Sequence, residues 1–112
     1  MSGNLVISSS KVEGTAVYNG NGEKLGSIDD LKIDKRSGLV RYAVLEFGGF
    51  LGIGTDRYPI PWKLLTYDTN LQGYVVPIAL PQLENAPRYV EGQAPEYSDD
   101  YGRKIDGHYG LA

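Results

Sequence analysis

Short apolar segments separated by turn signals dominate the chain from Gly14 to about Ile78. Gly, Asn, Asp or Pro recurs about every eight to twelve residues between runs rich in Val, Ile, Leu and Tyr, a spacing typical of a small β-barrel or sandwich. No stretch of helical periodicity of useful length interrupts these runs. The hydrophobic pattern therefore predicts an all-β domain.

The predicted strands differ in regularity. The run LVRYAVLEF at 39–47 is almost continuously apolar and rich in β-branched and aromatic residues, so we expect it to be the deepest strand. The segment LGSIDDLKID at 25–34 alternates irregularly, and a β-bulge near Asp29 and Asp30 would restore its inward face. The segment RYPIP at 57–61 is expected at an edge because its prolines donate no ladder hydrogen bond. Further strands are expected at 15–19, 65–68 and 73–80.

The composition changes beyond Arg88, where Pro, Gly, Glu and Asp become frequent. Ser98 is placed to cap a helix whose first turn carries two aspartates, which suit the helix dipole. Tyr101, Ile105 and either His108 or Tyr109 would share one face of this helix. Because two internal glycines weaken it by about 1 kcal/mol each, we expect it to form only when docked, either on its own domain or on a neighbouring chain.

A length of 112 residues indicates one domain with a modest core. We divide the chain into a flexible N-terminal arm at 1–10, the β domain at 11–87 and a C-terminal tail at 88–112. The N-terminal apolar run is only Leu5 to Ile7, too short for a signal peptide or a membrane span. The 15 glycines and 9 tyrosines exceed typical usage and favour short strands with tight turns.

The charge and the reactive residues exclude several function classes. A net charge of −3 with scattered basic residues argues against independent nucleic-acid binding. The absence of cysteine excludes disulfides and thiolate metal sites and fits the cytoplasm. With a single histidine and no paired-carboxylate signature, we expect no enzyme activity, no cofactor and no metal site. Asp29, Asp30 and Asp34 lack the ligand spacing of a calcium loop and are expected to cap turns or face solvent.

The segment EFGGFLGIGTDRYPIPW at 46–62 places large apolar side chains on a glycine-rich backbone. It lacks the third glycine of a dinucleotide fingerprint, and its prolines forbid the helix that must follow. We expect the glycines to bend the sheet sharply while Phe47 and its apolar neighbours plug one end of the domain. The expected structural residues of this loop are Gly48, Gly49, Gly52, Gly54 and Trp62, with Trp62 as a core anchor.

An alternative interpretation has part of this loop projecting outward, because contiguous exposed apolar groups are uncommon on monomers. Phe50 and Leu51 would then contact a second chain. The predicted interaction surface combines this loop with the tail: Phe50, Leu51, Ile53, Tyr101, Ile105 and Tyr109.

Several quoted motifs resemble the PRC-barrel domain family, which takes its name from the cytoplasmic part of the photosynthetic reaction-centre H subunit. They are GTAVYNGNGEKLGSIDD, SGLVRYAVLEFGGFLGIG, PIPWKLLTYD and GYVV, and the terminal DGHYGLA is similar to the ends of free-standing bacterial members. The resemblance covers Lys11 to about Pro87. It implies a small six-stranded β-barrel with short helical turns, an assembly or regulatory role and no shared active site.

These observations predict a non-catalytic, cytoplasmic protein-interaction or assembly module. We expect it to self-associate, with a dimer favoured, and leave its protein partner unidentified. The alternative is an RNA-processing or ribosome-associated accessory barrel. The absence of a transmembrane segment leaves only peripheral association with a membrane complex.

Overall fold

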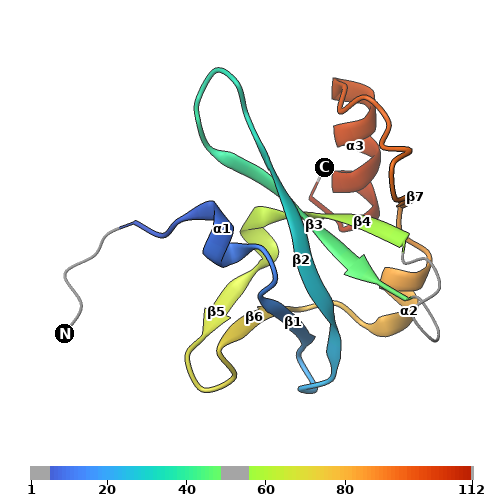
Figure 1. The fold of residues 1–112 in the computed structure, drawn as a ribbon. Coiled ribbons are helices and arrows are strands. Elements are labelled where there is room, and N and C mark those ends of the chain that lie inside the picture. The colour runs from blue at the N-terminus through green and yellow to red at the C-terminus, as the bar shows by residue number, and fades with distance from the viewer. Residues whose placement is uncertain (1–5, 49–55, 112) are drawn as a thin grey trace.

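The computed structural model describes residues 6–48 and 56–111, which form one curved sheet with three α-helices beside it (Figure 1). The strands run in the order β5-β6-β1-β2-β3-β4-β7. Their bounds are β1 Ala16–Asn19, β2 Lys24–Ile33, β3 Val40–Phe47, β4 Asp56–Pro61, β5 Thr66–Asp68, β6 Gly73–Val76 and β7 Tyr89–Val90. Neighbouring strands pair antiparallel, except that β1 and β6 pair in parallel.

The sheet corrects the expected six-stranded closed barrel in two respects. It has seven strands, because Tyr89 and Val90 of the predicted tail pair with the start of β4. Among the residues that the structure describes, its two end strands, β5 and β7, do not pair with each other, so the sheet is not closed by hydrogen bonds. These end strands contribute only three and two residues, too little backbone for a long closing ladder.

The irregular pattern of β2 is a β-bulge, as the sequence predicts. The register with β3 shifts between Ile28 and Asp30, so Asp29 is the extra residue. The bulge keeps Ile28 at 1% exposure in the core and leaves Asp29 at the surface, where its Oδ2 accepts a hydrogen bond from Arg57 Nε at 3.1 Å. The neighbouring strand β3 has four consecutive buried residues, whereas β4 has five, so the expectation that β3 is the deepest strand is wrong.

In the described part of the chain, the prolines of β4 lie where no further strand pairs with the sheet. Pro59 and Pro61 face Val44 and Tyr42 of β3, whereas β7 pairs only with Asp56 and Arg57. The proline-containing half of β4 is therefore an edge, as the missing N–H groups require. The chain then enters a short 3-10 helix, η2 (Trp62–Leu64).

The core is a single cluster of buried side chains, to which five strands and all three α-helices of the described residues contribute. Helix α1 (Ser9–Val12) contributes Val12, and α2 (Leu80–Glu84) contributes Leu83, both almost fully buried. Helix α1 overlaps the end of the N-terminal segment expected to be flexible, because the burial of Val12 in the core holds this helix against the sheet. Residues 6–8 precede it as exposed chain without regular structure.

Helix α3 (Asp99–His108) forms where the sequence predicts it and docks on its own domain. The Ser98 side chain accepts a hydrogen bond from the Tyr101 N–H, which confirms the predicted N-cap. The helix packs against β4, with Ile105 at 0% exposure, and a ring nitrogen of His108 lies 2.7 Å from the Gln82 carbonyl oxygen of α2. The segment after Arg88 is thus part of the folded domain in this structure.

Candidate functional site

The turn between β2 and β3 projects from the body of the molecule (Figure 1). We call residues 33–39 the hairpin tip. Asp34 Oδ1 accepts hydrogen bonds from the backbone N–H groups of Arg36 and Ser37, both at 2.9 Å, and Gly38 adopts a φ of +77°. The tip is therefore held by a capped turn, with glycine at the position that requires a left-handed backbone.

The hairpin tip carries two exposed apolar side chains. Ile33 is 54% exposed and Leu39 is 68% exposed, and the Asp34 N–H donates to the Leu39 carbonyl oxygen at 2.8 Å, which keeps the two arms of the turn together. Lys35 and Arg36 are also exposed between them. The tip thus presents apolar and basic groups on a defined backbone, as an interaction surface requires.

The hairpin tip is expected to loosen in acid. Its two backbone hydrogen bonds, first from Ser37 and then from Arg36, hold the pKa of Asp34 below its ordinary value of 3.8. The stabilisation is complete above pH 3.8 and is lost as the pH falls through the lower folded-state pKa. An NMR titration should show the amide resonances of Arg36 and Ser37 moving with a midpoint below 3.8. A midpoint at or above 3.8 would contradict the capping role.

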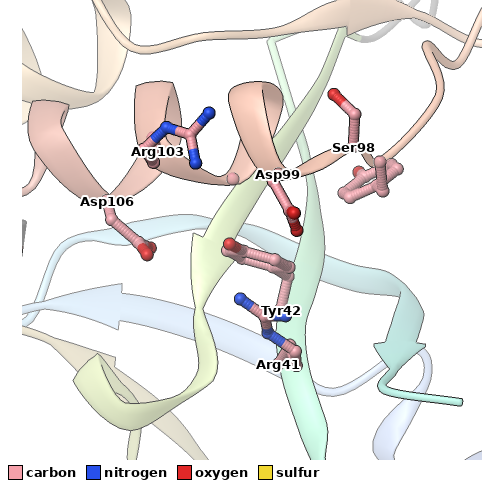
Figure 2. A pocket seen from close by; sticks show the side chains of 8 residues that line it. Arg41, Tyr42, Ser98, Asp99, Arg103 and Asp106 are labelled. Atoms are coloured by element: carbon pink, nitrogen blue, oxygen red, sulfur yellow. The ribbon is translucent and has the colours of Figure 1, made fainter. Parts of the chain in front are cut away.

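A second candidate site is a pocket of about 200 Å³ between β3 and α3 (Figure 2). Figure 2 shows the Tyr42 ring rising from β3 toward α3, with the carboxylates of Asp99 and Asp106 directed toward it and Arg41 below. The full lining is Arg41, Tyr42, Tyr97, Ser98, Asp99, Gly102, Arg103 and Asp106. The pocket is polar because charged side chains from two elements meet over two aromatic rings.

Tyrosine rings connect this pocket to the tail. Tyr97 lies with its ring centroid 6.0 Å from that of Tyr42 and 5.2 Å from that of Tyr101, and its hydroxyl is 2.8 Å from the Tyr89 hydroxyl. Burial, followed by the nearby Asp106 carboxylate, raises the pKa of Tyr42. Burial, followed by Tyr89, raises the pKa of Tyr101 to about 12. These hydroxyls therefore stay protonated near neutral pH.

The three aspartates of the sequence analysis have structural partners. Asp29 joins the buried Arg57, which also meets Glu91 of the tail at 3.3 Å, and Asp30 pairs with Lys32 at 3.1 Å. The remaining one, Asp34, caps the hairpin tip. Within residues 6–48 and 56–111, no group of three or more His, Cys, Asp or Glu side chains is arranged to hold a metal ion.

The glycine-rich loop is described only at its start. Gly48 has a φ of +90°, so it provides the backbone freedom expected there. Phe47, just before it, is partly buried and makes an edge contact with Tyr58 at 5.4 Å between ring centroids. The other predicted loop residues lie outside the described residues, so their roles stay predictions: Gly49, Phe50, Leu51, Gly52, Ile53 and Gly54.

The remaining predicted residues lie in or against the core. Trp62 is partly buried with its ring 5.5 Å from that of Tyr74, and its anchoring role stays a prediction. Ile105 and the partly buried Tyr101 lie on the inner face of α3, and Tyr109, the C-cap residue of this helix, is 8% exposed. Their part in an intermolecular surface stays a prediction, and in this structure it requires α3 to leave its own sheet.

Two features of these sites were not expected from the sequence. In the hydrophobic pattern, Ile33 and Leu39 belong to the predicted strands, so their exposure was not expected. Their position on either side of a polar turn is the feature that could have indicated it. Tyr42 lines the same pocket as Asp99 and Asp106, although these residues are more than fifty positions apart in the sequence. No local pattern reports such a contact.

The described residues define a small β-rich domain with a projecting hairpin and a docked C-terminal helix. The family profile of the PRC-barrel domain matches residues 5–79, which is more than half of the chain. The chain therefore belongs to the PRC-barrel domain family. The matched region ends before α2, so α2, β7 and α3 lie beyond it. The comparison with curated proteins gave no match.

No helix within residues 6–48 and 56–111 is long and apolar enough to cross a bilayer.

Proposed function

We propose that this chain is a non-catalytic, cytoplasmic assembly module that self-associates through its hairpin tip. The observation that carries the proposal is the exposure of Ile33 and Leu39 together on a projecting, hydrogen-bonded turn. Large apolar side chains that a projecting segment exposes to solvent are uncommon on a monomer and mark contact surfaces. Membership of the PRC-barrel family, a family of interaction modules, supports this proposal.

A dimer is the simplest assembly, because a two-fold axis places the same patch of each copy against the other. Two hairpin tips that meet in this way would bury four apolar side chains, each worth about 1.5 to 3 kcal/mol if it were fully buried. Lys35 and Arg36 would then lie at the rim, where solvent screens their repulsion.

The double variant Ile33→Ser/Leu39→Ser tests this proposal. We expect the dimer dissociation constant, measured by sedimentation velocity, to rise about tenfold or more because the apolar contact is lost. The control Val90→Ser removes a similar apolar side chain, 53% exposed on β7, and should leave the constant unchanged. Equal association of all three proteins would contradict the hairpin tip as the contact.

The exposed pair Lys35 and Arg36 favours the second candidate function, an RNA-associated accessory domain. RNA contacts made by these two charges would weaken with rising salt, because phosphate contacts release bound counterions. Retention of RNA that disappears in Lys35→Ser/Arg36→Ser would favour this candidate over self-association.

A further inference from the structure

The pocket between β3 and α3 leaves two carboxylates without an ionic partner. Arg41 Nη1 lies 3.5 Å from Asp34 Oδ2, and Arg103 pairs with Asp100, so both lining guanidiniums have an ionic partner outside the lining. Among the described residues, neither Asp99 nor Asp106 forms an ion pair. The two lining carboxylates are therefore the charged groups of the pocket that have no ionic partner of their own.

The Tyr42 hydroxyl is an independent sign that a polar group is missing. Tyr42 is only 5% exposed, and within residues 6–48 and 56–111 its hydroxyl forms no hydrogen bond of ordinary geometry, although Asp106 and Arg41 act on it electrostatically. It reaches beneath Gly102 of α3, where an added Cβ would lie 3.0 Å from the hydroxyl oxygen. An unpaired buried hydroxyl costs about 1 to 3 kcal/mol, so a ligand that supplied an N–H donor would remove this cost.

We propose that this pocket binds a small organic cation, an alkylammonium or guanidinium group, held by Asp99, Asp106 and the Tyr42 hydroxyl. The carboxylates accept charge-assisted hydrogen bonds from its N–H groups. The rings of Tyr42 and Tyr97 also line the pocket, and each already lies beside a cation, Arg41 at 5.7 Å and Lys32 at 5.1 Å from the ring centroids, which shows that this setting accepts positive charge. A volume of about 200 Å³ suits one such group with a short stem.

An anion fits the same pocket poorly, although the N-terminus of α3 borders it. The Tyr101 N–H of the first turn already donates to the Ser98 side chain, and Asp99 places a negative charge at this end, whereas Asp100 is paired with Arg103. Like charges would repel an incoming carboxylate or phosphate.

The pocket combines the family region with the segment after it. Arg41 and Tyr42 lie within residues 5–79, whereas the six other lining residues belong to 97–106. The cation could come from a free amine or from a basic side chain of a partner peptide, and both carry the same chemistry. The proposal does not depend on self-association, because all of the lining belongs to one copy.

The test is an NMR titration of the full chain with agmatine and, separately, with a capped pentapeptide carrying one central arginine. We expect the backbone amides of Gly102 and Asp106 to shift at about millimolar concentrations. A response to agmatine alone identifies a free amine as the source, and a stronger response to the peptide identifies a partner side chain. No shift at these amides with either probe, or tighter binding of acetate, would overturn the proposal.

Three variants locate the binding. Asp106→Asn should weaken binding about tenfold, because a hydrogen bond to a charged group is lost. Glu96→Gln removes the same charge from the residue that precedes Tyr97, outside the pocket lining, and should change the dissociation constant less than about twofold. Tyr42→Phe keeps the ring, should leave the fold intact and should weaken binding. Equal losses in Asp106→Asn and Glu96→Gln, or unchanged binding in Tyr42→Phe, would contradict the assigned contacts.

Discussion

Replacement of Ile105 by Ala is expected to lower the free energy of unfolding by about 3 to 4 kcal/mol. Ile105 is 0% exposed and lies in the same core cluster as residues of the sheet and of α2. Removal of its side chain leaves a cavity beneath α3, which carries two glycines and has little intrinsic stability. The total stability of such a domain is about 5 to 15 kcal/mol, so a large part of it would be lost. Urea unfolding followed by tryptophan fluorescence measures the change.

Lys104→Ala is the matched control for this prediction. Lys104 is exposed on the same helix and Ala is a good helix former, so its effect should stay within about 0.5 kcal/mol. A loss of less than about 1 kcal/mol in Ile105→Ala would mean that the segment after Arg88 is not an integral part of the core.

Replacement of Gly26 by Ala is expected to cost about 3 kcal/mol, at the upper end for overpacked sites. Gly26 lies in β2 beside β3, and an added Cβ would overlap the Glu46 carbonyl oxygen and lie 3.3 Å from a methyl group of Leu45. Since the first obstacle is backbone, it cannot move aside as a flexible side chain can. The two strands would have to separate locally, and this pair forms the largest interface of the sheet.

Gly20→Ala provides the comparison at a site with free space. A Cβ at Gly20 would meet nothing within 4 Å, and its φ is not in the left-handed region. The free energy of unfolding of this variant should lie within about 0.5 kcal/mol of the wild-type value, or be slightly higher, because alanine restricts the conformations of the unfolded chain. Thermal unfolding by circular dichroism compares the two variants, and similar midpoints would contradict the close approach of β2 and β3.

Local patterns predicted the elements whose cause is local. The broken alternation around Asp29 indicated a bulge, and Ser98 marked the start of α3, because a bulge and a cap each depend on a few adjacent residues. The proline pair predicted the edge character of β4 for the same reason.

Features that depend on distant pairing were missed or left open. The β7 pairing joins Tyr89 to Arg57, and the parallel pairing of β1 with β6 joins Val17 to Tyr74. Whether α3 docks on its own sheet or on another chain depends on whether the core has space for Ile105. The hydrophobic periodicity of the sequence carries no information about that space. The candidate pocket was missed for the same reason, since it exists only after α3 has docked over Tyr42.

Self-association is the central claim, and sedimentation equilibrium of the wild-type chain tests it most directly. Over a wide range of protein concentration, the weight-average mass should rise from 12.3 kDa toward twice that value. A mass that stays at 12.3 kDa at every concentration would contradict the assembly function proposed for the hairpin tip.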